Sequence, residues 1–173
     1  MSTIRYISLF SGIEAATVAW QQLGWEPIAY AEIEPFPKAV LKHHYPNVPD
    51  LGDVTKVNWK EYHHAADVVV GGSPCQAFSI AGLRKALDDP RGQLMLEYLR
   101  ACAEIDPEWV VWENVTGVLS ADGGRAFGSL LASVAELWPN GGCAWRVLDA
   151  QFFGVAQRRE RVFLVVNTRD WRR

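Results

Sequence analysis

The chain has 173 residues, of which 49% are hydrophobic and 21% charged, as is ordinary for a globular protein large enough to bury a core. No apolar run is long enough to span a bilayer, and the first residues lack the pattern of a secretory signal, so we expect a cytoplasmic protein. The three cysteines, Cys75, Cys102 and Cys143, are too few and too widely spaced for a disulfide framework or a paired-cysteine zinc site.

The net charge of −3 does not by itself indicate a nucleic-acid partner, but the charge is unevenly distributed. Residues 158–173 hold six arginines and two acidic residues, a net charge of +4, which leaves −7 for the rest of the chain. A basic end on an acidic body suits a surface that faces phosphates, and an ordinary solvated surface explains the pattern equally well.

Short apolar runs alternate with helical patterns, which predicts an α/β fold with a mostly parallel sheet and helices on both faces. The runs that predict strands are residues 4–10, 27–33, 67–71, 109–113, 144–148 and 161–166, with a weak further strand that ends near Gly52 and Asp53. The helical patterns are residues 15–23, 35–44, 93–105 and 126–137. With no internal repeat and no long linker, residues 1–173 are expected to form a single domain.

Polar side chains recur where the predicted strands end. Glu32, Asp53, Cys75 and Glu113 lie at or just after such ends, and the turn at residues 11–12 follows the first strand in the same way. Because the carboxyl ends of parallel strands share one rim of a sheet, where ligands bind, we expect these groups to converge on one cleft.

The turn after the first strand favours a cofactor without phosphates. Gly12 lets the backbone approach a ligand closely, but the glycine series of a nicotinamide-cofactor site is absent, and Glu14 adds negative charge near a helix start. The positively charged sulfonium of S-adenosylmethionine fits this turn better. Glu32 suits ribose hydroxyls or is a surface carboxylate, and Asp53 accepts from an adenine amino group or caps a turn.

The loop at residues 71–76 has the pattern most typical of catalysis. Two glycines end a strand, and Pro74 fixes the backbone directly before Cys75, where a nucleophile would be placed. Most lone cysteines are packing residues, and we expect that role for Cys102, in a helical run, and for Cys143, beside glycines.

Two further patterns supply an acid and basic groups. Glu113 ends a strand beside Trp112, which suits a catalytic acid, and a solvated turn residue is the alternative. Arg159 and Arg161 precede the last strand, and alternation places them on one side. A basic strand edge that discourages pairing with other strands is the alternative there.

Taken in order, these segments resemble the motifs of the cytosine-5 DNA methyltransferases. The matching segments run almost end to end and are Leu9-Phe10-Ser11-Gly12, Glu32, Gly52-Asp53-Val54, Ser73-Pro74-Cys75-Gln76, Arg91-Gly92-Gln93-Leu94, Glu113-Asn114-Val115 and Gln157-Arg158-Arg159-Glu160-Arg161. The resemblance implies a Rossmann-like, S-adenosylmethionine-dependent methyltransferase fold. It also implies methyl transfer to carbon 5 of cytosine in double-stranded DNA, typical of bacterial or phage-encoded restriction-modification.

The resemblance gives each matching residue a role. Cys75 would attack carbon 6 of a cytosine flipped out of the duplex, Glu113 would protonate the ring near N3, and Arg159 and Arg161 would hold the base. The residues implied to line the cofactor pocket are Phe10, Ser11, Gly12, Glu32, Ile33, Asp53, Val54, Pro74 and Leu94. Those implied to contact DNA or the base are Gln76, Ser79, Arg84, Arg91 and Gln157. Residues 77–92 resemble a mobile loop that closes over DNA, and no metal is implied.

Two departures from the family pattern matter. Glu14 stands where family members usually have a second glycine, which predicts an altered pocket wall. The family's target-recognition region and its last Gly-Asn motif, whose helix completes the cofactor domain, are absent, so we expect a second chain to supply the missing region.

Other functions remain open at this point. One alternative is a non-catalytic remnant that keeps the fold and binds S-adenosylmethionine, and another is an RNA cytosine-5 methyltransferase. Adenine-N6 methylation is disfavoured because that chemistry uses an Asn/Asp-Pro-Pro-aromatic loop, where this chain has Ser73-Pro74-Cys75-Gln76.

Overall fold

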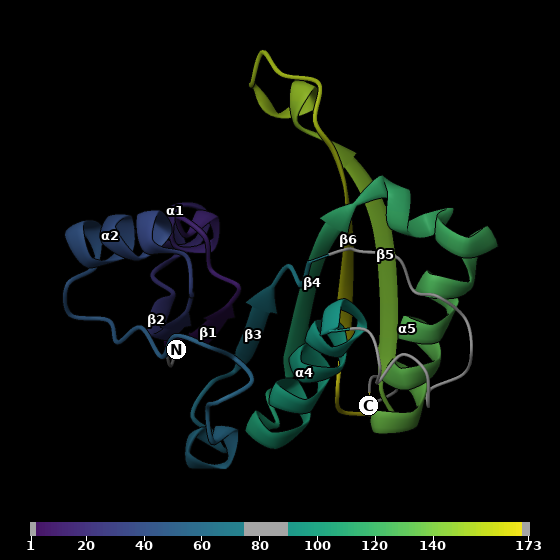
Figure 1. Cartoon of the computed structure of the whole chain (residues 1–173), viewed down its shortest axis with the longest axis horizontal. Coiled ribbons are helices and arrows are strands. Elements are labelled where there is room, and N and C mark those ends of the chain that lie inside the picture. The colour runs from purple at the N-terminus through teal and green to yellow at the C-terminus, as the bar shows by residue number, and fades with distance from the viewer. Residues whose placement is uncertain (1–2, 75–89, 171–173) are drawn as a thin grey trace.

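A six-stranded sheet forms the centre of the computed structural model, which describes residues 3–74 and 90–170 (Figure 1). Its strands, in the spatial order β2-β1-β3-β4-β6-β5, are β1 (Arg5–Leu9), β2 (Glu26–Ala31), β3 (Val68–Gly71), β4 (Trp109–Val115), β5 (Gly142–Asp149) and β6 (Glu160–Asn167). The first four are mutually parallel, whereas β6 is antiparallel to both of its neighbours. The α/β fold with a mostly parallel sheet is thereby confirmed.

Helices follow the predicted pattern closely. The α-helices are α1 (Ala15–Trp20), α2 (Pro35–His44), α4 (Pro90–Ile105) and α5 (Arg125–Leu137). The short 3-10 helices are η1 (Gln21–Leu23), η2 (Trp59–Tyr62), η3 (Thr116–Leu119), η4 (Ala121–Gly124) and η5 (Ala150–Phe153). The helix expected over residues 15–23 is therefore α-helical only to Trp20 and tightens into a 3-10 turn before Gly24. None of the described helices is long and apolar enough to cross a membrane.

The prediction of a weak strand that ends near Gly52 and Asp53 is wrong. Asp50 forms only an isolated bridge with Tyr30. Pro49 accepts a hydrogen bond from Tyr30 but has no N–H to donate, so the ladder cannot extend through it. The Asp50 carboxylate instead accepts from the amide of Gly52, which turns the chain away from the sheet.

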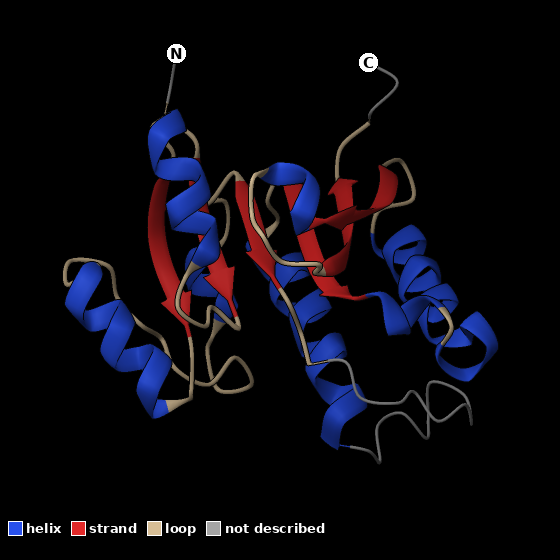
Figure 2. Ribbon diagram, turned by 90° about the horizontal axis from the view of Figure 1, so that it is seen from above, coloured by secondary structure: helices blue, strands red, loops and turns tan. Residues whose placement is uncertain are grey.

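The two faces of the sheet are covered unequally. On one face α4 and α5 pack over the central strands, and Tyr98 and Leu130 join Leu9, Val69 and Trp112 in the apolar core. Helices also lie on the other face, where α1 covers β1 and β2 (Figure 2). Burial of this apolar surface on both sides is the main stabilising contribution expected of such a layered fold.

Beyond α1, residues 3–74 and 90–170 leave the second face open. Trp109 and Val165 are exposed there, and a hollow of about 520 Å³ lies over the strands. It is lined by Ile4, Trp20, Trp25, Asp67, Val68, Glu108, Trp109, Val111 and Val165. The lining is mostly apolar, with Asp67 and Glu108 as its charged members.

A buried polar cluster fixes α1 to the sheet. Glu14 has a left-handed backbone (φ 68°), and its carboxylate accepts a hydrogen bond from the amide of Thr17 at 3.0 Å, which caps the helix. The Thr17 hydroxyl bonds in turn to the hydroxyls of Tyr6 and Tyr30. Glu14 is only 1% exposed, and its Oε2 has no hydrogen-bond partner among the described residues. Burial raises the pKa of Glu14 above its ordinary value.

We expect Glu14→Gln to change how stability depends on pH. In the wild type the folded state holds the Glu14 proton more tightly than the unfolded chain, so stability falls as pH rises from the ordinary glutamate pKa to the raised one. The variant lacks this loss, so its free energy of unfolding should rise relative to the wild type over that interval and then level off. Urea unfolding at a series of pH values measures the difference.

Glu136→Gln is the matched control, because Glu136 is an exposed glutamate on α5. Its difference from the wild type should stay nearly constant with pH. A Glu14→Gln curve that runs parallel to the wild-type curve would contradict this account of the buried carboxyl group.

Candidate active site

The loop that follows β3 is attached to the end of β4. Ser73 is buried, its hydroxyl accepts from the Trp112 ring N–H at 3.1 Å, and its carbonyl accepts from the Asn114 side-chain amide at 2.8 Å. Both donors are buried side chains of β4 on the face that packs against α4 and α5. The backbone that leads to Cys75 is therefore held against β4 by two hydrogen bonds that water does not compete for.

Gly72 brings that loop directly beside Glu113. A Cβ at position 72 would lie 3.0 Å from both the carbonyl oxygen and Oε2 of Glu113. That separation is shorter than ordinary van der Waals contact, so a larger residue would push against the carboxylate. The glycine is explained by this close approach of two backbones at the rim of the sheet.

Glu113 is paired with Arg161, a contact that the sequence analysis did not predict. Arg161 lies opposite Val115 in the antiparallel β4–β6 pair, so it is the diagonal neighbour of Glu113 on the same face. The Arg161 Nε is 2.9 Å from Glu113 Oε1, and both side chains are partly buried. The ion pair places the Arg161 guanidinium beside Glu113 Oε1. Glu113 Oε2 lies on the side of Gly72 and faces the loop after β3.

Arg159 lies at the base of an arm that projects from the rim between β5 and β6 (Figure 1). The Asp149 carboxylate holds that base by accepting from the amides of Gln151 and Arg159. Burial opposes the charge on Asp149, but these hydrogen bonds outweigh it and hold the pKa of Asp149 below its ordinary value. Arg159 and Gln157 themselves are exposed.

At the ends of β1 and β2, Glu32 joins two turns. Its Oε2 accepts from the amide of Gly12 at 2.7 Å, and its Oε1 accepts from the amides of Ile33 and Glu34 at 2.8 Å each. A carboxylate offers about four lone-pair sites, so these three bonds leave one for a hydroxyl donor. Open space lies above Gly12, since nothing lies within 4 Å of a Cβ built there. Ile33 is 62% exposed beside it.

Other residues predicted for the cofactor pocket have structural contacts. The Ser11 hydroxyl bridges β1 and β2 by bonding to the Ser8 carbonyl and the Ala31 amide. Phe10 is half-buried with a left-handed backbone (φ 53°), and Val54 is buried in the core.

Asp53 caps a turn, which was one of its two predicted roles. Its Oδ1 accepts from the amide and hydroxyl of Thr55, and these bonds hold the pKa of Asp53 below its ordinary value. Of the remaining predicted pocket residues, Pro74 is exposed at the rim and Leu94 is half-buried in α4.

Several predicted site residues lie outside the described residues: Cys75, Gln76, Ser79 and Arg84, together with the side chain of Arg91. The other two cysteines are described. Cys102 is buried, as expected, and burial raises the pKa of its thiol well above the ordinary value, which makes it a poor nucleophile. Cys143 is exposed on β5, so the packing role expected for it is wrong.

The basic end of the chain does not form one edge. Arg161 is at the start of β6 and Arg169 lies just after its end, so the length of the strand separates them. Arg169 is bound to Asp106 through its guanidinium at 2.8 Å. Of the arginines of this end that the structure describes, those at positions 158, 159 and 161 therefore stand at the rim with Glu113.

Sequence reasoning missed the residues that hold this site together. Asn114 was read as part of a motif and Asp149 was not singled out, yet one fixes the loop and the other fixes the arm. Asp50 was also missed, and its carboxylate accepts from the Glu32 amide at 3.1 Å. Their signal is weak because a polar residue at a strand end is equally common in an ordinary turn.

Comparison with known proteins agrees with this geometry. Residues 4–172 match the family model described as C-5 cytosine-specific DNA methylase. The chain belongs to this family of DNA methyltransferases, and the predicted S-adenosylmethionine-dependent methyltransferase fold is confirmed. The DNMT2 structure from Spodoptera frugiperda superimposes with a TM-score of 0.78 over 98% of this chain and 51% of that one, at 21% identity.

Two relatives match nearly the whole chain, but the chain covers different shares of their own lengths. A DNA N-6-adenine-methyltransferase of Escherichia phage P1 is 44% identical over 98% of this chain, but the chain spans only 29% of that protein. The type II methyltransferase M.AquIA of Picosynechococcus is 36% identical, and the match covers 94% of this chain and 71% of the relative.

The close approach at Gly72 predicts a selective loss of stability. Gly72→Ala should lower the free energy of unfolding by about 1–3 kcal/mol, because the added methyl group meets Glu113. Gly128→Ala, within α5 where nothing lies within 4 Å of the new Cβ, should raise it by about 0.5–1 kcal/mol. Urea unfolding of both variants checks the pair, and a Gly72→Ala protein as stable as Gly128→Ala would rule out the contact.

Proposed function

We propose that this chain transfers a methyl group from S-adenosylmethionine to carbon 5 of cytosine in DNA, through a covalent bond between Cys75 and carbon 6. The observation that supports it most directly is the position of Glu113. Its carboxylate stands beside Gly72, three residues before Cys75, with Arg161 at its back. A nucleophile and an acid entering one rim from neighbouring strands are what this chemistry needs.

In the proposed reaction the Cys75 thiolate forms a bond to carbon 6 while Glu113 gives a proton to N3, which makes carbon 6 electrophilic. Arg161 keeps Glu113 oriented toward the ring through their ion pair. Bound S-adenosylmethionine supplies the methyl group that carbon 5 takes up. Water then accepts the carbon-5 proton, N3 returns its proton to Glu113, and Cys75 leaves as the thiolate, which restores the double bond.

The rim at β1 and β2 suits the cofactor. Glu32 has a lone pair left for a ribose hydroxyl, the space over Gly12 admits a ligand against the backbone, and Ile33 offers an exposed apolar surface to an adenine ring. Glu14, whose carboxyl group is buried, follows this turn, and the altered pocket wall expected there stays a proposal. Asp53 and Val54 would act indirectly, by shaping the loop next to Glu32.

The arm at residues 150–159 suits a nucleic-acid surface. Phe152 and Phe153 are exposed at the end of η5, and Arg158 and Arg159 are exposed just before β6. Cations near phosphates give affinity, and apolar groups can occupy the space left by a base that has flipped out of the stack. We assign the arm, with Gln157, to the side of the site that faces DNA.

We further propose that a region supplied by another chain completes the enzyme and selects the DNA target. The open sheet face supports this, because Val111 lines its hollow and Glu113 and Arg161 lie farther along the same face. A segment packed over that hollow would lie next to the catalytic pair and exclude water from it.

The name of the phage P1 relative does not assign adenine chemistry to this chain. That name describes a protein of which the chain spans 29%, whereas the cytosine family model covers residues 4–172. The Ser73-Pro74-Cys75-Gln76 loop also differs from the loop that adenine-N6 chemistry uses.

Trapping on DNA that contains 5-fluorocytosine tests the covalent step. Fluorine cannot leave carbon 5 as a cation, so the Cys75 adduct should persist when cofactor is present, and mass spectrometry should find it. The chain is tested alone and with the product of the neighbouring reading frame. Cys75→Ser should abolish the adduct, while Cys143→Ser, which changes an exposed thiol on β5, should not.

The other possible outcomes of this experiment would indicate a different function or a different nucleophile. An adduct on RNA and none on DNA would make the chain an RNA methyltransferase. No adduct on either, with or without the second chain, would leave a non-catalytic module. An adduct that survives Cys75→Ser would place the nucleophile elsewhere.

The cofactor site makes a separate prediction. Glu32→Ala should weaken binding of S-adenosylhomocysteine about tenfold or more, because it removes both the acceptor for the ligand and the bond that positions Gly12. Glu34→Ala is the control, since Glu34 is exposed two residues away and makes no side-chain cap bond to α2. Calorimetry measures both, and equal affinities in the two variants would remove Glu32 from the site.

A further inference from the structure

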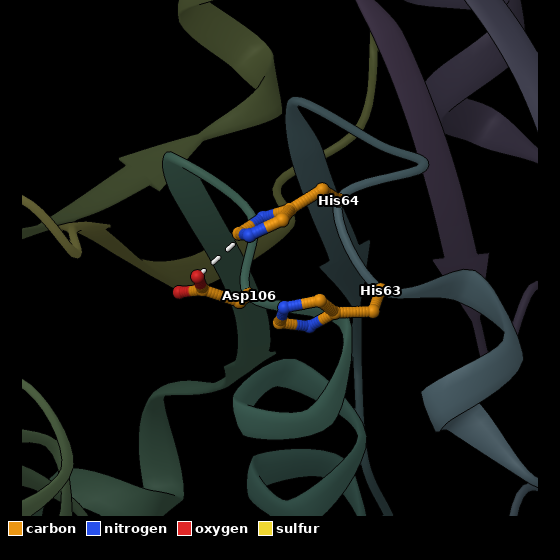
Figure 3. A group of neighbouring side chains, drawn as sticks. All are labelled: His63, His64 and Asp106. Atoms are coloured by element: carbon orange, nitrogen blue, oxygen red, sulfur yellow. Dashed lines mark ion pairs between the residues drawn. The ribbon is translucent and has the colours of Figure 1, made fainter.

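Two histidines and an aspartate meet at the end of the sheet opposite Glu113. His63 and His64 lie in the connection that leads to β3, and Asp106 lies between α4 and β4 (Figure 3). One candidate ligand atom from each residue lies within 4.8 Å of the other two. Among the described residues, this is the one group of three or more such side chains close enough to share an ion.

The spacing of His64 and Asp106 matches two ligands of one metal ion. His64 Nδ1 is 3.5 Å from Asp106 Oδ2. Bonds of about 2.0–2.1 Å at a tetrahedral zinc place neighbouring ligand atoms about 3.3–3.5 Å apart. Binding one zinc ion to both His64 Nδ1 and Asp106 Oδ2 would therefore require little movement of either side chain.

The hydrogen bond of His63 Nδ1 leaves the other ring nitrogen, Nε2, available to bind a metal ion. His63 Nδ1 lies 3.0 Å from the carbonyl oxygen of Glu104, and because a carbonyl only accepts, that nitrogen carries the proton. Nε2 then keeps its lone pair. A metal-binding histidine commonly donates its second ring N–H to a backbone carbonyl in this way. The two histidine rings lie 3.9 Å apart, and both residues are exposed, so they can adjust to an ion.

A backbone hydrogen bond and the guanidinium of Arg169 hold Asp106, the third ligand, next to His64. The His64 amide donates to the Ile105 carbonyl at 2.8 Å, which holds the two connections together. Arg169 binds Asp106 Oδ1 at 2.8 Å and leaves Oδ2 on the histidine side. The guanidinium lowers the affinity for a cation, but it also orients the carboxylate, as hydrogen-bonded partners of ligating carboxylates do.

We propose that His63, His64 and Asp106 bind one zinc ion, with water as the fourth ligand. Two imidazoles and a carboxylate are borderline ligands that suit zinc better than calcium or magnesium. The ion would join the connection before β3 to the end of α4, and through Asp106 to the segment after β6. Its effect is on the stability of the fold, because the site lies at the far end of the strands from Glu113.

Calorimetry with zinc on the metal-free full chain tests the site. The expected stoichiometry is one ion per chain, and His64→Ala or Asp106→Asn should weaken binding at least tenfold. Zinc should also raise the Tm of the wild type and not that of these variants. The control is the double variant His43→Ala/His44→Ala, which removes the other pair of adjacent histidines, on α2, and should bind zinc as the wild type does.

Cobalt as a probe separates this site from the cysteines. Bound at two imidazoles and a carboxylate, it should give visible bands without the near-ultraviolet charge-transfer band of a thiolate ligand. A thiolate band, equal binding in the wild type and His64→Ala, or no binding at all would each overturn the proposal.

Discussion

The attachment of the loop after β3 to the end of β4 is the constraint on which the site depends. Asn114 and Trp112 hold Ser73, and the absence of a side chain at Gly72 lets the loop pass within contact of Glu113. The parallel β3–β4 pairing brings both strands to one rim, and the antiparallel β6 then delivers Arg161 to the same place. The backbone that leads to Cys75 and the side chains of Glu113 and Arg161, to which we assign the catalysis, thus come together through ordinary strand pairing.

Much of this was predictable because strand periodicity and the shared rim of parallel strands are strong signals. They placed Glu32 and Glu113 at the end of the sheet where the structure has them, whereas the ion pair between Glu113 and Arg161 was not predicted. The missing third strand was not predictable from the apolar pattern, because it depends on the lost donor of Pro49 and on the carboxylate of Asp50. Composition could not decide between the two interpretations of the basic end, because it does not reveal that Arg161 and Arg169 lie at opposite ends of β6.

The molecule divides its chemistry between the two ends of the sheet. The rim at the carboxyl ends of the parallel strands carries the Glu113–Arg161 pair and the Glu32–Gly12 turn, to which we assign catalysis and cofactor binding, whereas the other end carries the histidine cluster beside Asp106. Between them, the open face over β4 and β6 links the site to a surface that another segment can cover.

The most direct test of the account is a crystal structure of the complex trapped on DNA that contains 5-fluorocytosine. We predict a flipped base with Cys75 Sγ bonded to carbon 6, the Glu113 carboxyl group within about 2.7–3.0 Å of N3, and Arg161 still paired with Glu113. A base bound with Glu113 directed away from its ring, or a bond to carbon 6 from any other residue, would contradict the claim that the β3 loop and the β4 end form one catalytic site.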